Sequence, residues 1–137
     1  MKGPLPAICF LYFALVGFAQ KPMATQKLMQ KLTNRPEFPG GDSALRVFMV
    51  KNIIYPQMER DNDIQGKPLL RFMVDTIGAI EDIQVVKKVS PGLDKEAVRV
   101  VKLMPLWRPA MYKNKPVPVY YVLPVKFYLT KDGKPEN

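Results

Sequence analysis

The chain has 137 residues, a formal net charge of +9, a single cysteine and no histidine. A chain of this length predicts one compact domain with short additional segments. The lack of histidine excludes serine–histidine and cysteine–histidine nucleophiles and zinc sites of the usual cysteine/histidine type. We therefore expect no metal and no cofactor. The positive charge is interpreted as a basic, soluble surface, with binding to an anionic envelope surface as the alternative.

The first nineteen residues differ from the rest of the chain. A basic start at Lys2 precedes the apolar run "LPAICFLYFALVGF", which contains Cys9 and is short for a membrane span. Gly17 and Ala19 have the spacing of a cleavage site, so we interpret residues 1–19 as a secretory signal, with an uncleaved anchor as the alternative. An exported protein with scattered lysines is not expected to bind nucleic acid.

Residues 20–35 are polar and read as a linker, and the folded part is expected at residues 36–130, before a polar tail at 131–137. Asp42 or Ser43 could cap a first helix, because apolar side chains recur at helical spacing through Ile53. Pro56 suits the start of a second short helical turn.

The segment "GKPLLRFMVDTIGAIEDIQVVKKV" predicts a β-hairpin. Apolar and polar side chains alternate up to Val74, and "DTIG" supplies a turn in which Gly78 can take a positive φ. Ile80 is out of phase with Ile83 and Val85, so we expect a β-bulge near Glu81–Asp82.

The second helix is expected in "SPGLDKEAVRVVKLMP", with Asp94 as its cap or first-turn acid and Pro105 as its end. Trp107, the only tryptophan, follows between Pro105 and Pro109. A recognition tryptophan is one interpretation. We favour a structural anchor that folds into the seam between this helix and the sheet, because a buried aromatic of this size fills the open end of a small core.

The last strand alternates over residues 117–129, with Pro118 and Pro124 in the opposite phase. Proline cannot donate to a ladder, so this strand is expected at a sheet edge. Such an edge can accept a partner's extended segment as an added strand. The order helix, strand, strand, helix, strand predicts an α+β domain, with a small three-stranded antiparallel sheet and two helices on one face.

Paired acids are the remaining candidates for an active site, and each has an ordinary explanation in turn, hairpin or helix-start chemistry. No pairing across the fold is indicated, so we predict that the protein is not an enzyme. The pairs are Asp61 with Asp63, Glu81 with Asp82, and Asp94 with Glu96.

Four stretches together resemble the TonB C-terminal domain family over residues 36–130: "GGDSALRVFMVKNIIYP", "IQGKPLLRFMVDTIGAIEDIQVVK", "LDKEAVRVVKLMPLWRPA" and "NKPVPVYYVLPVKFYL". The resemblance implies a periplasmic energy-transducer module that binds the TonB box of an outer-membrane receptor through its last strand, near Tyr55 and Pro56. By position, the partner-binding residues would be Val119, Tyr120, Tyr121, Val122, Leu123, Val125, Lys126, Phe127, Tyr128 and Leu129.

The chain departs from that pattern in ways that bear on function. An energy transducer stays anchored beside the ExbB–ExbD motor, whereas this leader looks cleavable and the linker is short. Pro68 stands where a β-former is usual, so the first strand is expected to start late. The alternative function is a free periplasmic adaptor that binds another envelope protein without the motor, and an exposed edge would also allow a homodimer.

Overall fold

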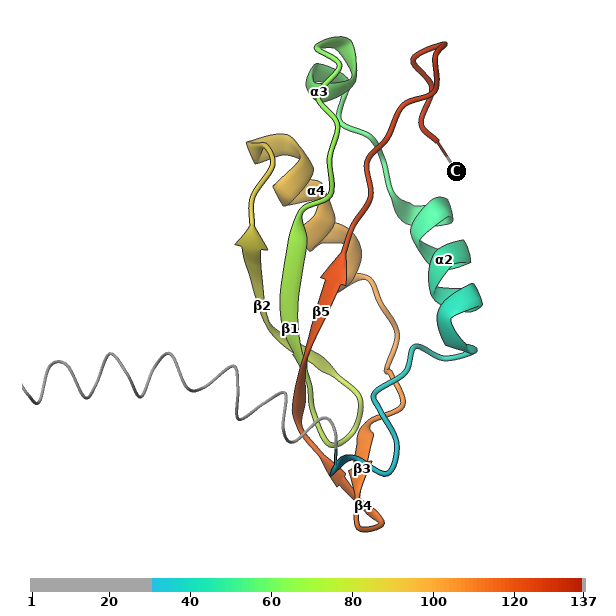
Figure 1. Cartoon of the computed structure of the whole chain (residues 1–137), viewed down its shortest axis with the longest axis vertical. Coiled ribbons are helices and arrows are strands. Elements are labelled where there is room, and N and C mark those ends of the chain that lie inside the picture. The colour runs from blue at the N-terminus through green and yellow to red at the C-terminus, as the bar shows by residue number, and fades with distance from the viewer. Residues whose placement is uncertain (1–30, 137) are drawn as a thin grey trace, which may run out of the picture. The chain divides into compact units, whose positions relative to one another are not determined.

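The computed structural model describes residues 31–136, and the residues from Thr33 onward form one compact unit. The expected signal at 1–19 and most of the linker lie outside the described residues. None of the helices within residues 31–136 has the length and apolarity that crossing a membrane would require. The elements (Figure 1) are α2 (Gly41–Asn52), α3 (Gln57–Asp61), β1 (Leu69–Val74), β2 (Ile80–Lys87), α4 (Pro91–Lys102), β3 (Ala110–Tyr112), β4 (Lys115–Val117) and β5 (Val119–Pro124).

The main sheet is antiparallel and three-stranded, in the order β2-β1-β5. This confirms the expected fold class and the place of the last strand at an edge. β5 pairs with β1 without interruption, from Leu69 opposite Pro124 to Val74 opposite Val119. β1 begins directly after Pro68, as expected from the proline at that position.

The core lies on one face of this sheet. Side chains on a strand alternate between faces, and Leu70, Phe72 and Val74 of β1 are fully buried while the residues between them are half-buried. Leu93 and Ala97 of α4 are also fully buried and belong to the same apolar cluster. Figure 1 shows α4 behind the sheet and α2 alongside β5.

The β1–β2 turn is fixed by side-chain and backbone hydrogen bonds. The Asp75 carboxylate accepts from the N–H groups of Ile77 (3.0 Å) and Ala79 (2.8 Å). Gly78 takes a φ of +91°, and its carbonyl accepts from the N–H of Trp107 at 2.8 Å. The turn is therefore tied to the segment that leaves α4.

The predicted bulge is present in β2. The β1–β2 register shifts by one residue between Arg71 and Met73, and Asp82 lies in the left-handed region at a φ of +51°. A second shift follows between Leu69 and Leu70. Each bulge inserts a residue that has no partner across the ladder.

The two long helices start differently. α2 is preceded by Gly40 at a φ of +89° without a side-chain cap, so the prediction of Asp42 or Ser43 as its cap is wrong. Gly40 occupies the position before the helix because glycine takes a positive φ without steric cost. α4 is capped by Ser90, which accepts from the N–H of Leu93, and Asp94 is its first-turn acid.

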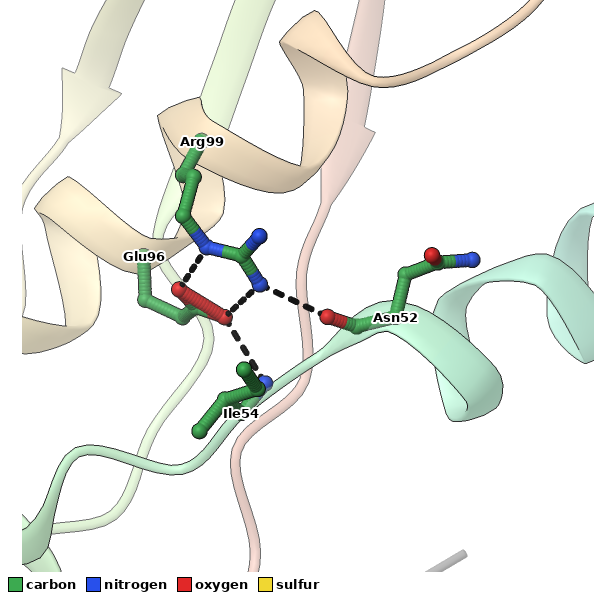
Figure 2. A network of polar contacts seen from close by, with 4 residues as sticks. All are labelled: Asn52, Ile54, Glu96 and Arg99. Atoms are coloured by element: carbon green, nitrogen blue, oxygen red, sulfur yellow. Dashed lines mark hydrogen bonds and ion pairs between the residues drawn. The ribbon is translucent and has the colours of Figure 1, made fainter.

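A buried carboxylate joins α4 to the end of α2 (Figure 2). Glu96, only 8% exposed, accepts from the N–H of Ile54 (2.7 Å) and from Nε of Arg99 (2.5 Å). Arg99 also donates to the carbonyl of Asn52 at 2.7 Å, which satisfies a carbonyl that the helix end leaves free. The network therefore holds the C-terminus of α2 against α4.

Two features of the fold differ from expectation. The strand predicted at 117–129 is shorter in the structure: Val117 ends β4, which pairs with β3 in a separate hairpin, and β5 covers only Val119–Pro124. One residue of the expected linker also pairs with the fold: Asn34 bridges Met111, and the N–H of Thr33 donates to the same Met111 carbonyl. The folded part therefore begins a few residues before the expected Pro36.

Candidate partner-binding edge

The outer edge of β5 carries backbone groups that point away from the sheet. Gly66 and Phe127 exchange both hydrogen bonds with each other, at 3.0 and 2.8 Å. Hydrogen-bonded pairs alternate along an antiparallel ladder, and β5 continues in the same register. The odd-numbered residues of this segment therefore bond to β1, and the even-numbered ones direct their N–H and C=O groups outward.

Two outward-facing positions along this edge lack a backbone N–H donor. Pro124, and Pro118 just before β5, occupy the outward phase and have no N–H. Tyr120, Val122 and Lys126 keep both an outward donor and an outward acceptor. Within residues 31–136, no further strand pairs with the outer edge of β5.

The predicted partner-binding residues fall into two groups of side chains. One group faces the helix-packed core: Val119, Leu123, Val125 and Phe127 are buried, and Tyr121 and Leu129 are half-buried. The other group points away from the core: Val122, Lys126 and Tyr128 are exposed, and Tyr120 is half-buried. Only the second group has side chains that a partner on the open face could reach.

Tyr120 is fixed across the open face of the sheet. Its hydroxyl donates to the Asp82 carboxylate at 2.8 Å, and the Arg71 guanidinium lies 5.0 Å from the centre of its ring. Arg71 in turn donates to Gln84 at 2.7 Å. The bulge at Asp82 therefore positions an acceptor for a side chain two strands away, which sequence periodicity alone could not indicate.

A groove of about 590 Å³ runs between α2 and the segment from Leu123 to Tyr128. Its apolar walls include Leu45 and Met49 of α2 and, opposite them, Leu123 and Phe127. Arg46, Asp42, Lys126 and Glu136 also line it, so both signs of charge are present. The outward groups of the edge thus border a partly apolar groove, and the α2 wall is the part that sequence analysis did not assign to the site.

Tyr55 and Pro56 lie close to this groove. Tyr55 lines it and is buried, with its ring edge-on to Phe127 at 5.6 Å. The Tyr55 hydroxyl donates to the carbonyl of Ile64. Pro56 precedes the first residue of α3. The Tyr-Pro turn therefore supports the strand segment from inside, with no exposed ring of its own to offer a partner.

Trp107 is inside the core, on the side of β5 that faces away from the open face of the sheet. It is 3% exposed and makes edge-on contacts with Phe38, Phe72 and Tyr121, at centroid distances of 5.9, 5.5 and 5.0 Å. Its Nε1 is buried without a hydrogen-bond partner in the described part of the chain. The structural anchor remains our interpretation of this residue, and the recognition role is the alternative.

Three tyrosines of the region are held in their protonated form. Burial raises the pKa of Tyr121 and of Tyr55, with smaller contributions from nearby carboxylates. The hydrogen bond to Asp82 raises the pKa of Tyr120. Their hydroxyls remain donors around neutral pH. Among residues 31–136, no cluster of histidine, cysteine, aspartate or glutamate side chains could hold a metal ion.

Comparison with known families identifies the domain. The model of the Gram-negative bacterial TonB protein C-terminal matches residues 51–129, well over half of the chain. The chain belongs to the TonB C-terminal domain family. The match spans β1, β2, α4 and β5 of this TonB domain, together with Tyr55, Trp107 and the whole outward edge.

One solved structure is also similar to this TonB domain. It is the NMR solution structure of the Helicobacter pylori TonB C-terminal domain, with 22% identity and a TM-score of 0.47. The alignment covers 64% of the present chain and 78% of the other. The search of curated proteins found no match.

Proposed function

We propose that this TonB domain binds the TonB box, an extended N-terminal segment of an outer-membrane TonB-dependent receptor, by strand addition to the outer edge of β5. The observation that carries the proposal is the outward row at Tyr120, Val122 and Lys126, which offers backbone donors and acceptors to a fourth strand. Backbone bonds would supply affinity in this mode, and alternate side chains would supply selectivity.

The groove beside the edge supports the same mode of binding. A strand laid against β5 would direct alternate side chains toward Leu45, Met49 and Phe127. Its other side chains would lie near Tyr120 and Val122 on the open face. The partner is therefore expected to carry apolar residues at every second position, and its binding links the domain to energised transport through the receptor.

Val122→Pro tests strand addition with little disturbance of the fold. It removes one outward N–H, in the phase where Pro118 and Pro124 already stand, and it leaves the bonds between β1 and β5 in place. Val122→Ala is the matched control, because this half-exposed side chain is shortened while the N–H is kept. Both variants should retain the circular dichroism spectrum of the parent.

The readout is a calorimetric titration with synthetic peptides from receptor N-terminal segments. We expect Val122→Pro to weaken binding at least about fivefold relative to Val122→Ala, since one net backbone hydrogen bond contributes about 1 kcal/mol. A peptide methylated on alternate backbone nitrogens should bind still more weakly. Equal binding by both variants and by both peptides would rule out strand addition.

A second candidate function is a free periplasmic adaptor that binds another envelope protein without the ExbB–ExbD motor. The leader with small residues at Gly17 and Ala19 favours it, as does the linker at 20–35, which reaches at most roughly 58 Å. Fractionation of cells that express the whole chain separates the two. Recovery in the soluble periplasmic fraction would exclude motor coupling by this chain, and recovery with the inner membrane would exclude the free adaptor.

A further inference from the structure

The C-terminal tail folds back onto the edge that follows β5. The N–H of Glu136 donates to the carbonyl of Tyr128 at 2.8 Å, and the N–H of Thr130 donates to the carbonyl of Lys134 at 2.7 Å. Leu129 and Pro135 form the antiparallel bridge between these bonds. A turn closed by Gly133 (N–H to the Thr130 carbonyl, 2.9 Å) connects the two arms.

This tail lies on the outer edge, in the phase of the proposed partner ladder. Tyr128 and Thr130 are even-numbered, like Tyr120, Val122 and Lys126, so the bonds to the tail leave the side of the chain that faces away from β1. Pro135 and Glu136 also line the groove beside α2. The tail therefore occupies the place where an added strand would continue past Lys126.

The tail is held lightly for a segment in that position. Residues 131–136 are all exposed, and none of them belongs to the apolar core cluster. Its attachment consists of backbone bonds at Tyr128 and Thr130 and of the Thr130 hydroxyl, which donates to the carbonyl of Lys134 and accepts from its N–H, both at 3.2 Å. Exposed backbone bonds of this kind open more easily than those of the core.

We propose that residues 131–136 act as an intramolecular strand that occupies the Tyr128 end of the partner edge and competes with a bound receptor segment. A short partner strand ends at Lys126 and leaves the tail in place. A longer strand that reaches Tyr128 has to displace the tail. It therefore binds more weakly than it would bind to an edge without the tail. The proposal rests on the proposed function, because it concerns the same edge.

Glu136→Pro is the most specific test. It removes the N–H that donates to Tyr128 together with the carboxylate side chain, and the added proline keeps Pro135 in the extended conformation that the bridge requires. Glu136→Ala is the matched control, since it removes the same charge and keeps the N–H. All proteins are purified after export from cells that express the whole chain.

Two measurements are made on the parent and both variants. Amide hydrogen exchange of Thr130 reports whether the tail is seated, independently of any partner. Titration with the receptor peptide that binds the parent best, and with the same peptide shortened stepwise from each end, reports competition. We expect Glu136→Pro to bind the full peptide about fivefold more tightly than Glu136→Ala, the effect of one net hydrogen bond, and to bind the shortest binding peptide equally.

The outcomes separate the two proposals. Equal affinity of Glu136→Pro and Glu136→Ala for every peptide would overturn competition by the tail, although strand addition could stand. Rapid exchange of Thr130 in the parent would overturn the seated tail directly. If no receptor peptide binds any of the three proteins, the proposed function fails. Slow exchange that is lost only in Glu136→Pro would then still support the tail as an occupant of the edge.

Discussion

Replacement of Trp107 by alanine should destabilise the fold without acting on the partner edge directly. The side chain is 3% exposed and is enclosed by Phe38, Phe72 and Tyr121. Truncation of a buried Trp or Phe to alanine costs about 3–5 kcal/mol. The free energy of unfolding of a small domain is about 5–15 kcal/mol, so the variant should lose a large part of its stability.

The assay is thermal and urea unfolding followed by circular dichroism. A loss of about 3 kcal/mol should lower the melting temperature by about 12 °C or more in a domain of this size. Trp107→Phe is the control: it keeps an aromatic ring in the cluster and removes the buried Nε1–H that has no partner within residues 31–136. It should lose much less, because an unsatisfied buried donor is itself costly.

A loss of peptide binding without a loss of stability would refute the structural role of Trp107. A Trp107→Ala protein that keeps the parent's melting temperature but no longer binds receptor peptides would show that the ring is a recognition element. A smaller loss of stability for alanine than for phenylalanine would contradict the packing argument, because alanine leaves the larger cavity.

Three further changes test the supports of the fold. Gly78→Ala should cost about 3 kcal/mol or more by chemical denaturation, since its Cβ would lie 1.8 Å from the Trp107 carbonyl oxygen at a φ that alanine rarely takes. Glu96→Ala should cost about 2–3 kcal/mol in the same assay, because it removes a charged acceptor from the end of α2. Asp75→Asn should lower the pKa of Glu81, followed by NMR titration, since the hydrogen bond to Asp75 and its charge now raise that pKa.

Matched controls distinguish these effects from general damage. Gly133 also has a positive φ, +70°, but a Cβ added there would meet open space. Gly133→Ala should therefore lower the free energy of unfolding only by the backbone strain, about 1–2 kcal/mol. Glu96→Gln keeps an acceptor for Ile54 and should cost less than Glu96→Ala. Equal losses for Gly78→Ala and Gly133→Ala would contradict the clash with Trp107, and an unchanged Glu81 titration would contradict the pairing with Asp75.

The edge strand could be predicted from the sequence because two independent patterns agree there. Alternation predicts which side chains of residues 117–129 are buried, and the prolines at 118 and 124 exclude a central position. Val119, Leu123, Val125 and Phe127 are indeed buried, and β5 is at the edge. Both patterns depend on neighbours along the chain, which is why a single sequence is enough.

The β3–β4 hairpin was not predicted because each of its strands has only 3 residues, too few for alternation to be recognised. Lys113 and Asn114 both take positive φ, at +49° and +62°, as a two-residue hairpin turn of type I′ requires. Asn tolerates this conformation, but lysine gives no such signal. The alternation of apolar residues from Val117 to Leu129 runs across Pro118, which separates β4 from β5, so the two segments looked like one strand.

The walls of the site depend on contacts between distant segments and could not be predicted. The face of α2 that borders the groove and the bulge that brings Asp82 to Tyr120 involve side chains far apart in sequence. Periodicity describes one element at a time, so it cannot show which two elements will meet. The burial of Glu59 beside Ser90 is a further example.

The two rims of the sheet differ, and the difference bears on self-assembly. β2 is interrupted by bulges near Asp82 and Val86, whereas the outer rim of β5 lacks donors at its prolines. Head-to-tail stacking of many copies would require the rim of β2 in one molecule to match the rim of β5 in the next. Their irregularities lie at different intervals, so they would interrupt a ladder between the two rims. Copies of this domain are therefore expected not to extend one another's sheets into fibres through these rims.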